Sequence, residues 1–263
     1  MDVITSRTNP TVRLVRSLLT RRAVRYRERI FVAEGLLAVT SLIENGNRLE
    51  TLLVDADRQA DVPSHLLDTA ERPNARSLLV SSEIFGYLSD VETPQPVIGV
   101  FAMPELVIPR SPRILVALDG VQDPGNLGSI LRTCRAAGVD GVVLSSGTVD
   151  PYNPKVVRST AGQFGDLPVL PVSNVDQIWS EHRSVPERVV IADHNAETLY
   201  TEFDWTTPFV LVLGSESAGV GDEWQARATD RVRIDMEAGV ESLNVAAAAA
   251  VLLFEARRQR ESV

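Results

Sequence analysis

The sequence predicts an α/β protein in two parts, a small α/β/α domain over residues 1–102 and a parallel-sheet domain over residues 113–263. Three observations carry this prediction. Segments with strand and helix patterns alternate along the chain, which is typical of α/β folds. Residues 103–112 contain three prolines and little periodic pattern, so we expect the linker there. Residues 114–118 are uniformly apolar, like strands of parallel sheets that are covered on both faces.

Composition limits the class of protein further. The 263 residues are 44% hydrophobic and 23% charged, which is ordinary for a globular chain with a sizeable core. The single cysteine, Cys134, excludes an internal disulfide and fits a reducing cytosol, so we expect a cytoplasmic protein. The histidines at positions 65, 182 and 194 lack metal-ligand spacing, and no metal is expected. The longest apolar run, residues 245–254, is too short to span a membrane, and the basic N-terminus has no apolar region after it, so we expect no secretory signal.

Charge is distributed unevenly along the chain, whose net charge is −9. Residues 1–29 carry +6 and the remainder −15, because this segment has only two acids, Asp2 and Glu28, against eight arginines: Arg7, Arg13, Arg16, Arg21, Arg22, Arg25, Arg27 and Arg29. A basic cluster on an acidic body is typical of a protein that binds a polyanion. A solvated amphipathic helix explains the same arginines equally well, and the residues alone leave both interpretations open.

The first half of the chain reads as alternating elements. Valines and leucines recur at helical spacing through residues 9–22. Asn45 and Gly46 end a second helix, since this pair favours a helix C-cap and a turn. We expect helices over residues 9–22, 36–43 and 63–69 and another from residue 81, and strands over residues 29–34, 49–54, 77–80 and 97–102.

The second half has the pattern of a parallel sheet. A helix is expected over residues 127–137, ended by Gly138. Another helix begins at residues 242–244, and it has no polar residue from 245 to 254, so we predict that it is buried nearly all round, against a sheet or a second chain. Strands are expected over residues 114–118, 142–144, 169–170, 189–192, 209–213 and 232–234.

Three loops in this half combine glycine with small polar residues, and each follows a predicted strand: residues 123–128, 214–219 and 239–244. In open parallel sheets, ligands bind outside the carboxyl ends of the strands. The three loops therefore predict one composite pocket, provided that the topology brings them together.

Familiar catalytic and nucleotide motifs are absent from these loops. The first lacks the dinucleotide fingerprint, which disfavours an unrelated Rossmann oxidoreductase, and no P-loop lysine is present. Residues 214–218 read GSESA and miss the nucleophile elbow at the last position. What remains is a pocket of backbone and apolar groups, suited to a neutral or cationic ligand such as an adenine-bearing sulfonium.

Three segments, DPGNLGSILRTCRAAG, LVLGSESAGV and IDMEAGVESLNVAAAAAVLLFE, occur in this order in residues 113–258. They resemble the three signature motifs of the SpoU (TrmH-type) RNA 2′-O-ribose methyltransferases of the SPOUT superfamily. Residues 29–37, RIFVAEGLL, are similar to the ribosomal-protein-like substrate-binding domain of family members that act on ribosomal RNA.

The resemblance implies an S-adenosylmethionine-dependent ribose 2′-O-methyltransferase acting on ribosomal RNA. It further implies a homodimer and a deep C-terminal trefoil knot in which the cofactor binds in a bent form. A transfer RNA enzyme is the alternative, as is a non-catalytic RNA-binding or ribosome-assembly protein on the same scaffold.

The resemblance also implies which residues form the site. Three match the cofactor-binding positions, which act largely through backbone groups: Gly214, Ile234 and Leu243. Five match the catalytic positions: Asn126, Arg132, Glu216, Ser242 and Asn244. Taken singly, the two asparagines and the serine could be helix caps, and Glu216 and Arg132 could be solvated; their joint occurrence favours the site. Asp235 departs from the family, which commonly has proline there, and Asp123 stands where asparagine is frequent.

For Arg132 we expect an electrostatic role. A guanidinium hardly ever loses its proton, so we expect Arg132 to stabilise the developing alkoxide of the ribose, while a phosphate oxygen or water takes the proton. The residues do not decide whether Arg132 acts in its own site or in that of a partner subunit.

Overall fold

The computed structural model describes residues 2–70, 75–89, 91, 93–181, 184–216, 218–240 and 242–262. The chain divides into two compact units. Unit 1 comprises Met1–Glu105 and Asp150–Asp166, and unit 2 comprises Leu106–Val149 and Leu167–Val263. The chain therefore passes between the units three times, and residues 150–166 belong to the unit that contains the N-terminal half.

Unit 1 is built on a four-stranded sheet of mixed direction, in the order β1-β4-β2-β3. The strands, at the places that the sequence predicts, are β1 (Ile30–Glu34), β2 (Leu49–Asp55), β3 (Arg76–Val80) and β4 (Val97–Ala102). The helices are α1 (Pro10–Thr20), α2 (Arg22–Glu28), α3 (Leu36–Glu44), the 3₁₀ helix η1 (Ala56–Asp61), α4 (Ser64–Ala70), α5 (Ser82–Leu88) and α7 (Pro154–Ser159).

The helix predicted over residues 9–22 is two helices. Arg21 has an extended backbone (φ −125°, ψ 107°), which ends α1 and begins α2. The helical spacing in α1 is confirmed, since Val12, Val15 and Leu18 are fully buried. The break turns α2 so that the side chain of Arg25 is buried in unit 1, which a single continuous amphipathic helix does not predict.

Residues 150–166 are an integral part of unit 1. Phe31 of β1 packs on Tyr152 and Phe164, with ring centroids 5.1 and 6.1 Å apart. Gly162 has φ +77°, and a Cβ there would lie 2.5 Å from a backbone oxygen of α3. A glycine is therefore needed where this segment lies directly on the helix.

Unit 2 is built on a seven-stranded sheet in which all pairings are parallel, in the order β7-β6-β5-β10-β8-β11-β9. The predicted parallel sheet is confirmed. Its strands are β5 (Ile114–Asp119), β6 (Gly141–Leu144), β7 (Val169–Pro171), β8 (Val189–Ala192), β9 (Thr198–Leu199), β10 (Phe209–Gly214) and β11 (Asp230–Arg233). Only β9 is unpredicted, because two residues are too short for a periodic pattern.

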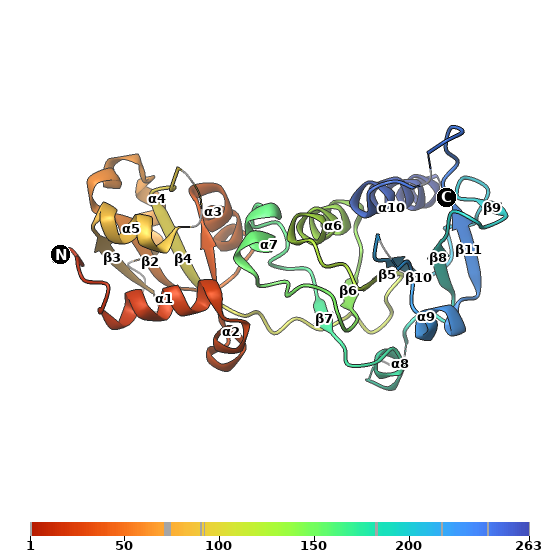
Figure 1. Ribbon diagram of the computed structural model, residues 1–263, viewed down its shortest axis with the longest axis horizontal. Coiled ribbons are helices and arrows are strands. Elements are labelled where there is room, and N and C mark those ends of the chain that lie inside the picture. The colour runs from red at the N-terminus through yellow and green to blue at the C-terminus, as the bar shows by residue number, and fades with distance from the viewer. Residues whose placement is uncertain are drawn as a thin grey trace. The chain divides into compact units, whose positions relative to one another are not determined.

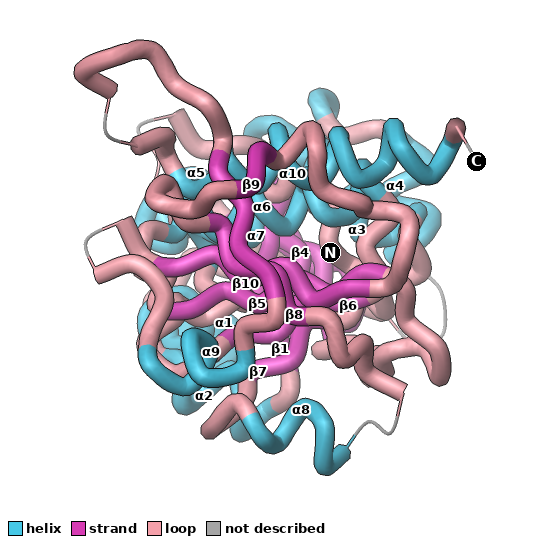
Figure 2. Tube along the Cα trace, turned by 90° about the vertical axis from the view of Figure 1, so that its right-hand side faces the viewer, coloured by secondary structure: helices cyan, strands magenta, loops and turns pink. Residues whose placement is uncertain are grey.

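The sheet of unit 2 is covered by the helices α6 (Pro124–Ala137), α8 (Asp176–Glu181), α9 (Asp222–Arg227) and α10 (Val245–Glu261). Figures 1 and 2 show α6 and α10 on one face and α8 and α9 on the other. Both faces are thus shielded from water, which explains the uniformly apolar central strands. Within the described residues, no helix has both the length and the hydrophobicity that crossing a bilayer requires.

The apolar helix α10 is only half buried. One face packs inside unit 2 through Val245, Ala249, Leu252, Leu253 and Ala256. On the other face, Ala247 is exposed and the side chain of Phe254 is 47% exposed. The sheet of the same chain therefore covers only one face of this helix, and the prediction that it is buried nearly all round now depends on a second chain, which stays a prediction. The sequence does not reveal which face of this helix is buried, because alanine fits both a buried and an exposed position.

Candidate active site

The three predicted loops meet at the carboxyl edge of the parallel sheet. Asn126 lies in α6 just after β5, Glu216 follows β10, and Asn244 caps α10. The amide Nδ2 of Asn126 donates to Oε1 of Glu216 at 2.8 Å. The Nδ2 of Asn244 donates to the same Oε1 at 2.9 Å and to Oδ1 of Asn126 at 3.0 Å. Three side chains from distant parts of the sequence thus form one hydrogen-bonded cluster.

A helix start fixes the orientation of this cluster. Oδ1 of Asn244 accepts a hydrogen bond from the backbone N of Ala246 at 3.0 Å, as an N-cap side chain does. Its Nδ2 must then face Oδ1 of Asn126, and Nδ2 of Asn126 in turn faces Glu216. Asn244 is therefore both a cap and a member of the cluster, so the two interpretations of this residue are compatible.

Asn126 is not a helix cap. The N-cap of α6 is Asp123, whose Oδ1 accepts from the backbone N of Asn126 at 2.8 Å. Pro124 occupies the first helical position, where proline is favoured, so α6 begins three residues earlier than predicted. This earlier start leaves the side chain of Asn126 free of capping and available to the cluster.

The loop that carries Glu216 is closed by short-range contacts. Ser215 and Gly219 exchange two backbone hydrogen bonds of 3.0 and 2.9 Å. A Cβ on Gly214 would lie 2.2 Å from the backbone of Gly219, so this position requires glycine. The carboxylate of Asp119, at the end of β5, accepts from the backbone N of Gly221 at 2.7 Å. Sequence reasoning missed Asp119, although an acid that ends an apolar strand is a visible signal.

Arg132 lies on α6 but apart from the cluster. Six residues of α-helix separate it from Asn126 by about 9 Å along the axis and about 120° around it. Its side chain is exposed and forms no hydrogen bond or ion pair with the residues that the structure describes. The charge of this guanidinium is therefore not neutralised within the described chain.

The remaining predicted residues lie beside the same sheet edge. Ile234 follows β11 directly and is half-buried, and Gly214 is the last residue of β10. Leu243 is 38% exposed, and Ser242 is exposed; both precede α10. The structure thus joins Asn126, Glu216 and Asn244 by hydrogen bonds and gives the other predicted residues none to this cluster.

Cysteine and metal chemistry find no support in this region. Cys134 of α6 is fully buried, and burial raises the pKa of its thiol, so the neutral form is retained. In the described part of the chain, no group of three or more His, Cys, Asp or Glu side chains could hold a metal ion.

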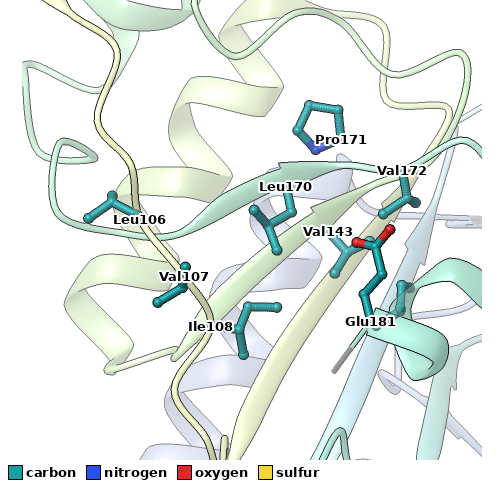
Figure 3. Close-up of a pocket in the computed structure, with 9 residues that line it drawn as sticks. Leu106, Val107, Ile108, Val143, Leu170, Pro171, Val172 and Glu181 are labelled. Carbon is teal, nitrogen blue, oxygen red and sulfur yellow. The ribbon is translucent and has the colours of Figure 1, made fainter. Parts of the chain in front are cut away.

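A cavity of about 180 Å³ opens at another place in unit 2 (Figure 3). It lies between residues 106–108, strands β6 and β7, and helix α8, and its lining is apolar apart from Glu181 and the backbone. None of the predicted site residues lines it. This cavity is therefore distinct from the meeting point of the three loops.

The cluster offers a donor and an acceptor side by side. Asn126 has a second amide hydrogen, and Oε2 of Glu216 has no hydrogen bond with the described residues. A hydroxyl group both donates and accepts, so it matches this pair. Glu216 is exposed and Asn126 is partly exposed, so solvent reaches both groups.

The fold and the cluster define a parallel-sheet α/β protein with a polar site at the carboxyl edge of its strands, built from three separate loops. Residues 113–254 match the SpoU rRNA Methylase family, and residues 9–99 match the MRM3-like substrate binding domain. The chain belongs to the SpoU rRNA methylase family, and the predicted resemblance is confirmed.

Relatives and solved structures resemble the whole chain. A 23S rRNA (uridine(2479)-2′-O)-methyltransferase of Streptomyces viridochromogenes is 32% identical and covers 98% of this chain and 93% of its own length. The 23S rRNA (guanosine(2553)-2′-O)-methyltransferase RlmP of Bacillus subtilis is 31% identical, and the match covers 98% of this chain and 100% of that protein. The crystal structure of the SpoU methyltransferase AviRb from Streptomyces viridochromogenes, in complex with AdoMet, has a TM-score of 0.87 at 30% identity, covering 97% of this chain and 99% of that chain.

Proposed function

We propose that this protein is an S-adenosylmethionine-dependent methyltransferase that modifies a ribose 2′-oxygen of ribosomal RNA. One observation carries the proposal: Asn126 and Glu216, joined by a hydrogen bond at the sheet edge where the three predicted loops meet, keep an amide hydrogen and a carboxylate oxygen that match a hydroxyl group. The names of the relatives, 23S rRNA 2′-O-methyltransferases, supply the substrate class.

Methyl transfer from a sulfonium is a single in-line displacement, and S-adenosylmethionine supplies the electrophilic methyl group. The protein must therefore position the attacking oxygen and stabilise its developing charge. We assign binding of the ribose hydroxyl to Asn126 and Glu216. We assign binding of the adenine ring of the cofactor to Ile234 and Leu243. Arg132 would stabilise the charge that develops on the attacking oxygen. The crowded backbone at Gly214 would hold the cofactor loop rigid.

The arginines of α1 and α2 supply an RNA-binding surface in unit 1. Arg13, Arg21 and Arg22 are exposed and form no ion pair with described residues, and Arg22 lies over the ring of Tyr26 at 5.1 Å. Arg25 is not part of this RNA-binding surface, because its side chain is buried and paired with Asp150. Unpaired arginines bind phosphates, so RNA affinity would fall steeply with salt.

We propose a homodimer in the cytoplasm, where ribosomal RNA of the bacterial relatives resides. The exposed face of α10, which carries Ala247 and Phe254, supports this assembly, because an exposed phenylalanine on an alanine-rich helix suits burial against a second chain. The trefoil knot that the resemblance implies stays a prediction.

Phe254→Glu is expected to shift the protein from dimer to monomer, since a carboxylate would be buried without a partner at the interface. Light scattering measures the mass across a concentration series. Phe254→Leu is the matched control and should stay dimeric. A monomeric wild-type protein, or a dimeric Phe254→Glu variant, would remove α10 from the interface.

The activity itself is tested with labelled S-adenosylmethionine and RNA from cells that lack the gene. We expect label in ribosomal RNA and a new site that resists alkaline cleavage, because a methylated 2′-oxygen cannot attack the neighbouring phosphate. Label in transfer RNA alone would instead establish the transfer RNA enzyme. RNA binding without transfer, together with no calorimetric heat from S-adenosylmethionine, would favour a non-catalytic assembly protein.

A further inference from the structure

Asp119 connects two strands of unit 2 at the edge where the site lies. It is the last residue of β5 and pairs in parallel register with Gly214, the last residue of β10. Its Oδ2 accepts a hydrogen bond of 2.7 Å from the backbone N of Gly221, at the far end of the loop that follows β10. The carboxylate therefore joins the base of that loop to the neighbouring strand.

The tip of the same loop is held by its own residues. Ser215 and Gly219 exchange two backbone hydrogen bonds, and Oγ of Ser215 accepts from the backbone N of Ala218 at 3.0 Å. Glu216 lies within this closed tip. These contacts keep the shape of the tip but do not fix its orientation on the sheet, which the contact of Asp119 with Gly221 constrains.

We propose that Asp119 is a positioning residue for the methyltransferase site. By holding Gly221 at the end of β5, it keeps Glu216 where its Oε1 can accept from both Asn126 and Asn244. Asp119 acts through the backbone of Gly221 and the loop, and among the described residues its carboxylate forms no hydrogen bond with Asn126, Glu216 or Asn244. This inference rests on the proposed function, since it assigns Asp119 to the orientation of the same site.

The proposal requires a hydrogen-bond acceptor at position 119, but it does not require that the acceptor be negatively charged. In Asp119→Asn, the amide oxygen can still accept from the N–H of Gly221, whereas Asp119→Ala removes the acceptor. The same strand supplies a matched control at its other end. There, Oδ2 of Asp140 accepts from the backbone N of Arg113 at 2.6 Å and of Ile114 at 2.9 Å, remote from the site.

Steady-state kinetics of methyl transfer separate positioning from stability. We expect Asp119→Ala to lower kcat by about 10- to 100-fold, the scale of a small misplacement of reacting groups, with the KM for RNA little changed. Asp119→Asn should recover most of kcat. Asp140→Ala should lower the melting temperature yet keep kcat. Equal losses of kcat in Asp119→Ala and Asp140→Ala, or no recovery in Asp119→Asn, would overturn the proposal.

Two further measurements test whether Asp119 acts on the site by holding the loop that carries Glu216. Amide hydrogen exchange of the peptide 214–222 should accelerate in Asp119→Ala and not in Asp119→Asn, and this readout needs no activity. In a Glu216→Gln background, Asp119→Ala should add little further loss of kcat, because both changes act on one unit. Unchanged exchange, or full additivity of the losses, would refute the role of Asp119. If the wild-type protein transfers no methyl group, the proposed function fails, and exchange alone still decides whether Asp119 holds the loop.

Discussion

Arg132→Ala is expected to lower kcat by about 100- to 1000-fold, the loss measured when one group that stabilises transition-state charge is removed. The side chain is exposed and unpaired among described residues, so the fold should be unaffected. Arg132→Lys keeps a cation but loses the planar donor set, and we expect an intermediate rate. Arg135, one turn further along α6, is the matched control and should tolerate alanine. Undiminished turnover and an unchanged pH–rate profile in Arg132→Lys would contradict the electrostatic role.

The position of Arg132 on α6 predicts in which subunit it acts. Because it is turned about 120° from Asn126, it does not point at the hydroxyl that Asn126 would bind in the same chain. We therefore expect it to enter the site of the partner. Reassociating an Asn126→Ala dimer with an Arg132→Ala dimer should then restore up to about a quarter of wild-type activity, since half of the dimers are mixed and each has one intact site. No recovery would place Arg132 in the site of its own chain.

Asp150→Ala is expected to destabilise unit 1 by about 3–5 kcal/mol, the usual cost of leaving a buried charge without its partner. Oδ2 of Asp150 accepts from Nε and Nη2 of Arg25 at 2.9 and 2.5 Å, and the two side chains are only 6% and 4% exposed. Its Oδ1 accepts from the hydroxyl of Tyr26 at 3.0 Å. The alanine variant would leave the buried guanidinium of Arg25 without its carboxylate partner and would remove the acceptor of the Tyr26 hydroxyl.

Hydrogen exchange of peptides from α2 and β1 measures this loss locally. The three tryptophans, Trp179, Trp205 and Trp224, all lie in unit 2, so their fluorescence follows that unit separately during urea unfolding. The double variant Arg25→Met with Asp150→Leu should be more stable than Asp150→Ala, because it removes both charges. Glu83→Ala, which breaks the exposed pair with Arg7, is the control and should change little. A loss below about 1 kcal/mol in Asp150→Ala would contradict the prediction.

Burial of the same region also affects its tyrosines. The pKa of Tyr152 is raised to about 12, first by burial and then by the nearby charge of Asp150. The pKa of Tyr26 is raised for the same reasons and by its hydrogen bond to Asp150. Since the folded pKa values exceed those of the unfolded chain, these phenols favour folding below pH 10, and that contribution declines as pH rises above it.

The parallel sheet, the positions of nearly all strands and the three loops of the site could be predicted from the amino-acid sequence alone. These features are encoded locally: apolar runs mark buried strands, glycines mark tight turns, and Asn244 marks a helix start. The family motifs added which loop residues to select. Local patterns were also sufficient for α1, whose buried valines and leucines recur at helical spacing.

The pairing of residues that are distant in the sequence could not be predicted, because it follows from the folded arrangement of the whole unit. The burial of Arg25 depends on Asp150, which lies 125 positions away in the sequence, and no periodicity connects them. Likewise, only folding brings Asn126, Glu216 and Asn244 within hydrogen-bonding distance, and only folding places the carboxylate of Asp119 on the backbone N–H of Gly221. The exposed face of α10 could not be predicted for a related reason. An alanine run is equally compatible with a buried and an exposed position, and the elements packed around the helix decide which face is covered.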